Sequence, residues 1–192
     1  STMGVTLLLT GDFSKGWEQY EWRWKDLSDP SVIRTFKQPL WDGKKSLKGK
    51  SILLYSEQGL GDTIQFSRYI LLIKALGAKV ILETHKELLN IVGSIDSDIT
   101  VILMGQALPH FDFQCPLLSL PLKFGTGVKN IPSPTRYIWA DKRKGSKWKK
   151  KIDALQKPLI GLAWEGNPLH KNDHNRSISL AELIPHLPTQ YK

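Results

Sequence analysis

Continuous apolar runs alternate with stretches of helical spacing between residues 51 and 140. The apolar runs are SILLY at 51–55, KVILET at 79–84, ITVILM at 99–104, FDFQC at 111–115 and RYIWA at 136–140. The stretches of helical spacing between them are 62–76, 86–92 and 116–124. Strands that are apolar throughout and separated by helices are typical of a parallel sheet covered on both faces. The pattern predicts a Rossmann-like, doubly wound α/β domain over residues 51–140.

A different pattern precedes this domain, in residues 1–28. Apolar residues recur at helical spacing on either side of Gly11 and Asp12, which predicts two short antiparallel helices. Apolar side chains would face one another across the turn: Leu7, Leu8, Phe13, Trp17, Tyr20 and Trp24. Gly16 would let the helices approach closely. The hairpin carries more aromatic surface than it can bury alone, so we expect the rest of the protein to cover part of it.

The remaining segments are a connector, a linker and the start of another unit. Residues 29–50 contain proline, glycine and charge without a period, which is typical of a connector that Phe36 and Trp41 would anchor to the next domain. Residues 141–157 predict a basic linker helix. In residues 158–192, the apolar run PLIGLAW precedes a helical stretch, SISLAELIPHL. This restart of the pattern predicts the truncated first part of a second α/β domain.

The composition narrows the choice of partners and compartment. The net charge of +9 is concentrated in DKRKGSKWKKK at 141–151, which we interpret as a solvated linker helix because it matches no nucleic-acid-binding motif. No apolar stretch approaches the roughly 18 residues of a membrane span, and the N-terminal residues do not form a signal peptide. Cys115 is the only cysteine, which favours a reducing cytoplasm and a buried, inert thiol.

The segment SEQGLGDT follows the first predicted strand, where open α/β sheets bind their ligands. Gly59 and Gly61 permit positive φ and the close approach of a ligand to the backbone. Asp62 would cap a helix whose positive dipole end points into the crevice. The segment lacks the third glycine of a dinucleotide fingerprint and the Gly-Lys-Ser/Thr of a P-loop, which argues against an NAD-dependent oxidoreductase. Glu57 and Gln58 either contact an acceptor or are solvated.

Three segments resemble parts of one enzyme family. ILLYSEQGLGDTIQFSRYILLIKALGAKVILE at 52–83 resembles the N-terminal Rossmann-like domain of the heptosyltransferase group, glycosyltransferase family 9, above all its bacterial members linked to tetratricopeptide repeats. GDFSKGWEQYEWRW at 11–24, followed by Pro30, is similar to the last half-repeat of a tetratricopeptide array. GLAWEGNPLHKNDHNRSISL at 161–180 is similar to the start of the family's C-terminal half.

The resemblance implies a GT-B fold and a metal-independent, cofactor-free transfer of a sugar from a nucleotide-sugar donor to an acceptor hydroxyl. It implies that Asp62 is the catalytic base. Substrate contacts would come from its neighbours Gln58, Gly59, Gly61 and Thr63. The donor diphosphate would be held by Asn167, Lys171 and Arg176, beside Trp164. The acceptor would be a glycan, a lipid-linked molecule or a protein, and the repeat region would bind protein partners. A chain with only the first part of the donor domain is expected to be inactive alone.

Two clusters of polar residues suggest metal binding, and a second function stays open. His170, Asp173 and His174 lie close together in the sequence, but no third strong ligand follows at a suitable spacing, so we predict no metal site. The sequence Asp96-Ser97-Asp98 resembles the Asp-x-Asp motif of the other large glycosyltransferase fold, but its position before an apolar strand favours a turn. The alternative function is a non-catalytic scaffold of tetratricopeptide repeats joined to a glycosyltransferase-like domain.

Overall fold

The computed structural model describes residues 2–25, 34–155, 159–170 and 172–188. The chain divides into two compact units, Ser1–Asp141 and Lys142–Lys192, and each is described by itself. Lys171, Pro30 and parts of the predicted connector and linker lie outside the described residues.

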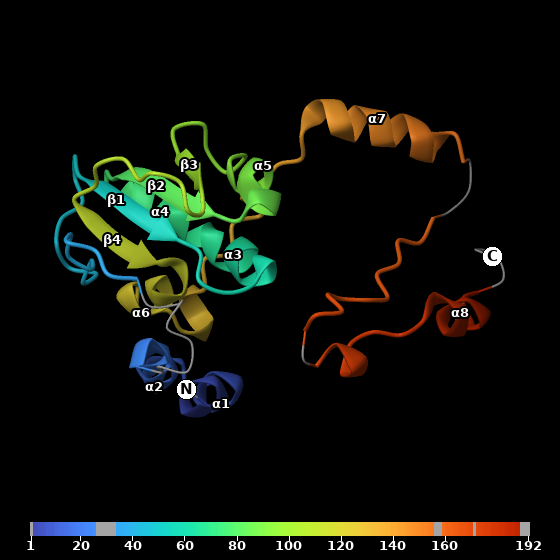
Figure 1. The fold of residues 1–192 in the computed structure, drawn as a ribbon, viewed down its shortest axis with the longest axis horizontal. Helices are drawn as coiled ribbons and strands as arrows, with labels where there is room; N and C mark the ends of the chain where they lie inside the picture. Colours follow the sequence, from blue (N-terminus) through green and yellow to red (C-terminus); the bar gives the residue numbers. More distant parts are fainter. Residues whose placement is uncertain (1, 26–33, 156–158, 171, 189–192) are drawn as a thin grey trace. The chain divides into compact units, whose positions relative to one another are not determined.

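The first unit contains a four-stranded parallel sheet (Figure 1). Its strands are β1 (Ser51–Tyr55), β2 (Lys79–Thr84), β3 (Thr100–Leu103) and β4 (Phe113–Pro116), in the order β3-β2-β1-β4. Leu53 of β1 pairs with Ile81 on one side and with Gln114 on the other. The chain therefore moves outward from β1 through β2 to β3 and then returns to the opposite side of β1. The predicted parallel α/β sheet is confirmed.

One face of the sheet is covered by helices. These are α3 (Leu60–Phe66), η3 (Ser67–Tyr69), α4 (Ile70–Ala75), η4 (Lys86–Leu88), α5 (Leu89–Val92), η5 (Leu117–Ser119) and α6 (Leu120–Lys123). Their apolar side chains form one cluster with Ile52, Leu54, Val80 and Leu82 of the strands. The single helix predicted for 62–76 is therefore three shorter pieces, which end before Gly77 at φ +82°.

The opposite face is covered differently, and the prediction of helices on both faces is wrong. Leu53, Tyr55 and Ile81 point to this face, where Phe36 and Phe111 pack against them. No α-helix among the described residues contributes a side chain to this second cluster. The physical reason is that residues 104–112, which connect β3 to β4, form a turn and an irregular segment instead of a crossover helix.

The predicted strand at 136–140 is also absent. Residues 131–140 form no strand, and they contact the helical layer and the turn after α5 through single hydrogen bonds. The hydroxyl of Tyr137 donates to the carbonyl of Ile64, and the amide of Trp139 donates to the hydroxyl of Ser94. In the described part of the chain no strand pairs with this run, so its backbone forms no ladder, and Ile138 packs individually against the first core cluster.

The predicted N-terminal hairpin is confirmed. It consists of α1 (Thr2–Leu9) and α2 (Phe13–Tyr20), followed by η1 (Glu21–Lys25). Gly11 in the turn has φ +89°, and the carboxylate of Asp12 accepts the amide of Lys15 as an N-cap. A Cβ on Gly4 would lie 2.7 Å from the amide nitrogen of Tyr20, and one on Gly16 would lie 2.7 Å from Leu8 Cδ2. The two helices therefore run antiparallel at a separation that only glycine permits.

The hairpin packs against the α/β domain, as its aromatic content predicted. The ring of Trp17 meets the ring of Phe66 edge to face, with centroids 6.1 Å apart, and its Nε1 donates to the carbonyl of Thr126 at 3.0 Å. Trp24 packs against the second core cluster. The connector is anchored as well, because Trp41 is 1% exposed and Phe36 contacts Tyr55.

The connector also pairs with the sheet. Leu40 forms an isolated parallel bridge with Gln114 of β4. The amide of Trp41 donates to the carbonyl of Gln114 at 2.9 Å, and the amide of Gln114 donates to the carbonyl of Pro39 at 3.1 Å. Residues 39–41 therefore lie along β4 as a rudimentary fifth strand.

The second unit contains α7 (Lys142–Asp153), η7 (Asp173–Asn175), α8 (Leu180–Leu183) and η8 (Ile184–His186). The strand predicted at 158–164 is not formed by its described residues, 159–164. A strand needs a partner for its amides, and the hydrogen bond from Ile178 N to Trp164 O is an isolated one. In the described part of the chain, no helix is both long enough and apolar enough to cross a membrane.

Candidate functional site

Successive strands are added on one side of β1 up to β3 and then on its other side at β4, which makes the carboxyl ends of β1 and β4 the topological switch point of the sheet. Open α/β sheets bind ligands in the crevice at this point, because the loops after the two strands diverge there. Glu57 follows β1, and Leu118 and Ser119 follow β4. These residues therefore line the position where the fold would place a ligand.

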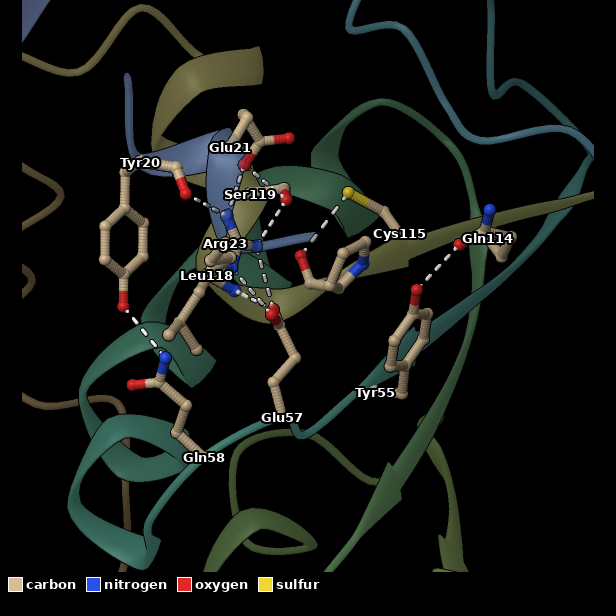
Figure 2. A network of polar contacts seen from close by, with 11 residues as sticks. Tyr20, Glu21, Arg23, Tyr55, Glu57, Gln58, Gln114, Cys115, Leu118 and Ser119 are labelled. Atoms are coloured by element: carbon tan, nitrogen blue, oxygen red, sulfur yellow. Dashed lines mark hydrogen bonds and ion pairs between the residues drawn. The ribbon is translucent and has the colours of Figure 1, made fainter. Parts of the chain in front are cut away.

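A side chain from the N-terminal hairpin occupies this position (Figure 2). Arg23 of η1 donates from Nε to Glu57 Oε1 at 2.9 Å and from Nη2 to Oε2 at 3.2 Å. The amide of Leu118 donates to the same Oε2 at 3.1 Å. The side chains of Arg23 and Glu57 are 9% and 1% exposed. The pair is thus a buried, bidentate ion pair, the strongest form of this interaction.

Two further residues complete the network around the guanidinium. Glu21 Oε1 accepts hydrogen bonds from Arg23 Nη1 at 2.6 Å and from the hydroxyl of Ser119 at 2.8 Å. Burial opposes the charge of Arg23, but Glu57 and Glu21 raise its pKa above the ordinary value. Burial raises the pKa of Glu57, while Arg23 and the amide of Leu118 oppose that rise. Three donors on one carboxylate favour its ionised form.

The side chains of Arg23 and Glu57 and the amide of Leu118 fill the switch point. Glu57 is neither solvated nor open to an acceptor, because its oxygens accept from Arg23 and Leu118. Sequence reasoning missed Arg23, whose neighbours in EWRW gave no sign of a partner 34 positions away. The aromatic excess of the hairpin was the available signal, because it indicated that η1 must lie against the sheet.

A second buried carboxylate lies near the carboxyl end of β2. Glu83, whose side chain is 1% exposed, forms an ion pair with Arg34 and accepts the amide of Gly105 at 3.2 Å. The guanidinium of Arg34 lies over the rings of Phe36 and Tyr55. The carboxylate that a dinucleotide site would direct at a ribose is therefore engaged with the connector, which argues further against a dinucleotide site.

Asp62 occupies a different helical position from the predicted one. Helix α3 begins at Leu60 with Gly59 as its N-cap, so Asp62 is the third residue of the helix and not its cap. Its Oδ2 accepts the amide of Gly59 at 3.0 Å. Gly59 has φ −68°, and Gly61 lies within the helix, so neither glycine uses the positive φ that its lack of a side chain permits. The extended backbone of Gly59 already provides the turn into the helix.

Asp62 lines a groove between the hairpin and α3. The groove has a volume of about 610 Å³. Its walls include the aromatic side chains of Phe13, Trp17, Tyr20, Phe66 and Tyr69, and its polar groups belong to Asp62, Gln65, Arg68 and Thr126. Sequence reasoning identified Asp62 but not the groove, because its walls come from the hairpin, from residues 62–69 and from residues 126 and 131, which no local pattern connects.

The other predicted substrate contacts differ in their accessibility. Gln58 is exposed, and its Nε2 donates to the hydroxyl of Tyr20 at 3.0 Å, so it joins the loop to the groove wall. Burial raises the pKa of Tyr20. Gly61 has open space where a Cβ would project. Thr63 is 1% exposed, and its hydroxyl donates to the carbonyl of Gly59. Its side chain is therefore buried in the core, where a substrate does not reach it.

The predicted phosphate-binding residues belong to the second unit. Asn167 accepts the amide of Leu169 at 3.0 Å and thereby shapes a turn. Arg176 lies beside Gly166, where an added Cβ would be 3.5 Å from its Nη2. Lys171 falls outside the described residues. The donor site therefore stays a prediction.

The polar clusters singled out as metal candidates form local turns. His170 Nδ1 accepts the amide of Asn172, and Asp173 accepts the hydroxyl of Ser177. Asp96 accepts the amide of Asp98, which confirms the turn predicted there, and Lys74 forms ion pairs with both carboxylates. Within the described ranges, no three His, Cys, Asp or Glu side chains are grouped so that they could hold a metal ion.

The thiol of Cys115 is buried in β4, as predicted, and burial raises its pKa. A thiol in this state is not a nucleophile, because the thiolate is the reactive form.

Comparison with known proteins gives one distant similarity. The chain is 25% identical over 183 residues to Protein FlbA of Caulobacter vibrioides, a match that covers 85% of this chain. The chain spans 30% of the length of FlbA. No protein-family model matches the chain, and no solved structure matches it at a significant level.

Proposed function

We propose that the chain is the acceptor-side part of a glycosyltransferase of the GT-B type, in which Asp62 is the general base. The observation that carries this proposal is the position of Asp62 in the lining of an aromatic-walled groove. The volume of about 610 Å³ is within the range of small-molecule sites. Aromatic rings such as those of Trp17 and Tyr20 suit the apolar faces of sugar rings.

The geometry of α3 suits the chemistry of a base. The amide of Gly59 holds one carboxylate oxygen of Asp62, which orients the group. In the proposed reaction, Asp62 takes the proton of an acceptor hydroxyl as the oxygen attacks the anomeric carbon of a nucleotide sugar. The bond from that carbon to the diphosphate breaks, and the nucleoside diphosphate leaves with the electron pair. Asn167, Lys171 and Arg176 would stabilise the charge on the leaving group.

The acceptor is a glycan, a lipid-linked molecule or a protein, and the hairpin belongs to a region that binds protein partners. The hairpin supports this view, because Gly4, Gly16 and the Gly11-Asp12 turn give the close helical packing that repeat units need.

The test is transfer from a panel of nucleotide sugars, measured for the chain and for a longer protein that contains it. Asp62→Asn should lower turnover by roughly a hundredfold while donor affinity changes little, because only the general base is lost. Asp12→Asn is the matched control, since it alters a helix-end carboxylate that does not line the groove. An Asp62→Asn variant with a near-normal rate would leave this carboxylate with a structural role only.

The second candidate function is a non-catalytic scaffold. The buried network of Arg23 and Glu57 favours it, because the network fills the switch point where the fold would bind a ligand. Calorimetry separates the two functions. A scaffold would bind none of the nucleotide sugars, whereas the enzyme would bind its donor when the donor-binding part is complete.

A further inference from the structure

Helix α7 of the second unit combines a high positive charge with an apolar stripe. Its sequence is KRKGSKWKKKID over 12 residues, Lys142–Asp153. The basic residues are Lys142, Arg143, Lys144, Lys147, Lys149, Lys150 and Lys151, and the acidic residue is Asp153. None of the helix residues is buried. The sequence alone suggests a solvated linker, but charge does not account for the apolar side chains on this helix.

The apolar stripe follows one side of the helix. Trp148 and Ile152 are four positions apart, and Leu155 follows three positions later in the turn that extends the helix, where its amide donates to the carbonyl of Ile152. Their exposed fractions are 61%, 47% and 57%. Spacings of four and three residues place the three side chains on a common face.

Lysines border this stripe. At 100° per residue, Lys151 lies on one side of Trp148 and Lys149 on the other. The ammonium of Lys151 lies 5.0 Å from the centre of the Trp148 ring, and Lys149 pairs with Asp153 at 2.7 Å. Lys144, four positions before Trp148, lies on the same face at the N-terminal end of the stripe, and the other basic side chains extend over the polar side. The stripe is therefore narrow, rimmed by positive charge and centred on a tryptophan.

We propose that α7 binds the surface of membranes that contain anionic lipids. The helix lies flat in the interface, with Trp148, Ile152 and Leu155 inserted at the boundary between headgroups and acyl chains. The lysines bind lipid phosphates, and their methylene stems reach past the boundary. A helix with a strongly basic polar face, low overall hydrophobicity and tryptophan on the apolar side is the type that binds in this way.

The apolar stripe favours a membrane over a nucleic acid. A nucleic acid would neutralise the lysines but leave Ile152 and Leu155 in water, because phosphates and base edges offer no continuous apolar surface. Anionic lipid provides both the negative charge and the apolar layer. The helix is about 18 Å long, so it offers a single reversible contact and not a span.

The experiment measures sedimentation of the 192-residue chain with vesicles. Vesicles of phosphatidylcholine with phosphatidylglycerol should bind the chain at least about tenfold more tightly than vesicles of phosphatidylcholine alone, because each basic side chain near an anionic surface strengthens binding roughly fivefold. Added salt should weaken this binding. Tryptophan fluorescence should shift to shorter wavelength on binding, and Trp148→Phe should abolish most of the shift.

Two variants separate charge from insertion. Replacing Lys149, Lys150 and Lys151 by glutamine should weaken binding by about a hundredfold, and the matched control replaces the three exposed lysines Lys44, Lys45 and Lys48 of the first unit. Trp148→Ser with Ile152→Ser should weaken binding at least about tenfold, with Trp22→Ser, an exposed tryptophan outside α7, as its control. Because these side chains are exposed, circular dichroism should show an unchanged fold.

Equal binding to both kinds of vesicle, or no binding to either, would overturn the proposal. Binding that survives Trp148→Ser with Ile152→Ser would show that nothing inserts, which also contradicts it. A DNA duplex or single-stranded RNA that binds more tightly than the anionic vesicles would assign α7 to nucleic acid instead. None of these outcomes depends on glycosyl transfer.

Discussion

Arg23 Nε and Glu57 Oε1 lie 2.9 Å apart, although 34 positions separate the two residues in the chain. The pair joins the N-terminal hairpin to the loop after β1, and it does so at the switch point of the sheet. The hairpin is therefore part of the same folded unit as the sheet. The loop that leads to Asp62 is fixed from outside the α/β domain.

Removing one residue of this ion pair should lower the stability of the protein. Arg23→Met leaves the Glu57 carboxylate buried without its counter-ion, so we expect the free energy of unfolding to fall by about 3–5 kcal/mol. Arg23→Met with Glu57→Leu should recover part of that loss, because no buried charge remains. Urea denaturation of the two single variants and the double variant gives the coupling energy of the pair.

The exposed pair of Lys149 and Asp153 is the control, with side chains 75% and 58% exposed. Lys149→Met should change the free energy of unfolding by less than about 1 kcal/mol. If Arg23→Met cost no more than this control, the network would be incidental to the fold.

Two glycines should respond in opposite ways to the same substitution. Gly4→Ala brings a Cβ to 2.7 Å from the backbone of Tyr20, so it should separate α1 from α2 and destabilise the protein by about 1–3 kcal/mol. Gly61→Ala meets nothing within 4 Å in α3 and should stabilise it by about 0.4–1 kcal/mol. Thermal and urea denaturation measure both effects.

The Gly61→Ala variant also bears on the proposed function. If an acceptor approaches the backbone beside Asp62, the added methyl group should lower transfer while the protein becomes more stable. A gain in stability with unchanged transfer would show that the acceptor contacts another part of the groove.

Asp112 should make stability depend on pH. The amide and hydroxyl of Ser51 donate to its Oδ2 at 2.8 and 3.0 Å, and these bonds together with Lys50 lower the pKa of the carboxyl. A carboxyl whose pKa is lower in the folded state adds stability above the unfolded pKa of about 3.9. That stability is lost as the pH falls through the folded pKa. Melting temperatures of the wild type and Asp112→Asn should therefore differ at neutral pH and converge in acid.

The exposed Glu18 provides a control for this titration, through Glu18→Gln. A difference between wild type and Asp112→Asn that stayed constant down to the lowest pH would contradict the role assigned to the ionised carboxylate.

The sequence predicted the elements that local periodicity controls. SILLY and KVILET became β1 and β2, and the glycine-aspartate turn at 11–12 gave the hairpin. Gly77 stopped the helical layer through its positive φ. Each of these depends on neighbours within a few residues, which the pattern of the chain contains.

Long-range contacts explain what the sequence did not predict. The partners of Glu57 and Glu83, Arg23 and Arg34, come from segments that no local pattern connects to the strands. The run at 159–164 has the composition of a strand, but a strand forms only where another backbone can accept its hydrogen bonds. The groove at Asp62 likewise depends on how the hairpin packs against α3.

The rudimentary strand at 39–41 protects the sheet from aggregation. An open edge strand offers unpaired amides and carbonyls to the edges of other molecules. On β4 the amide and carbonyl of Gln114 are already bonded to Pro39 and Trp41. Pro39 has no N–H to donate to a further strand, so the rudimentary strand at 39–41 is itself a poor partner for the edge strand of another molecule. The buried ring of Trp41 secures this cover, and loosening it would expose the edge to self-association.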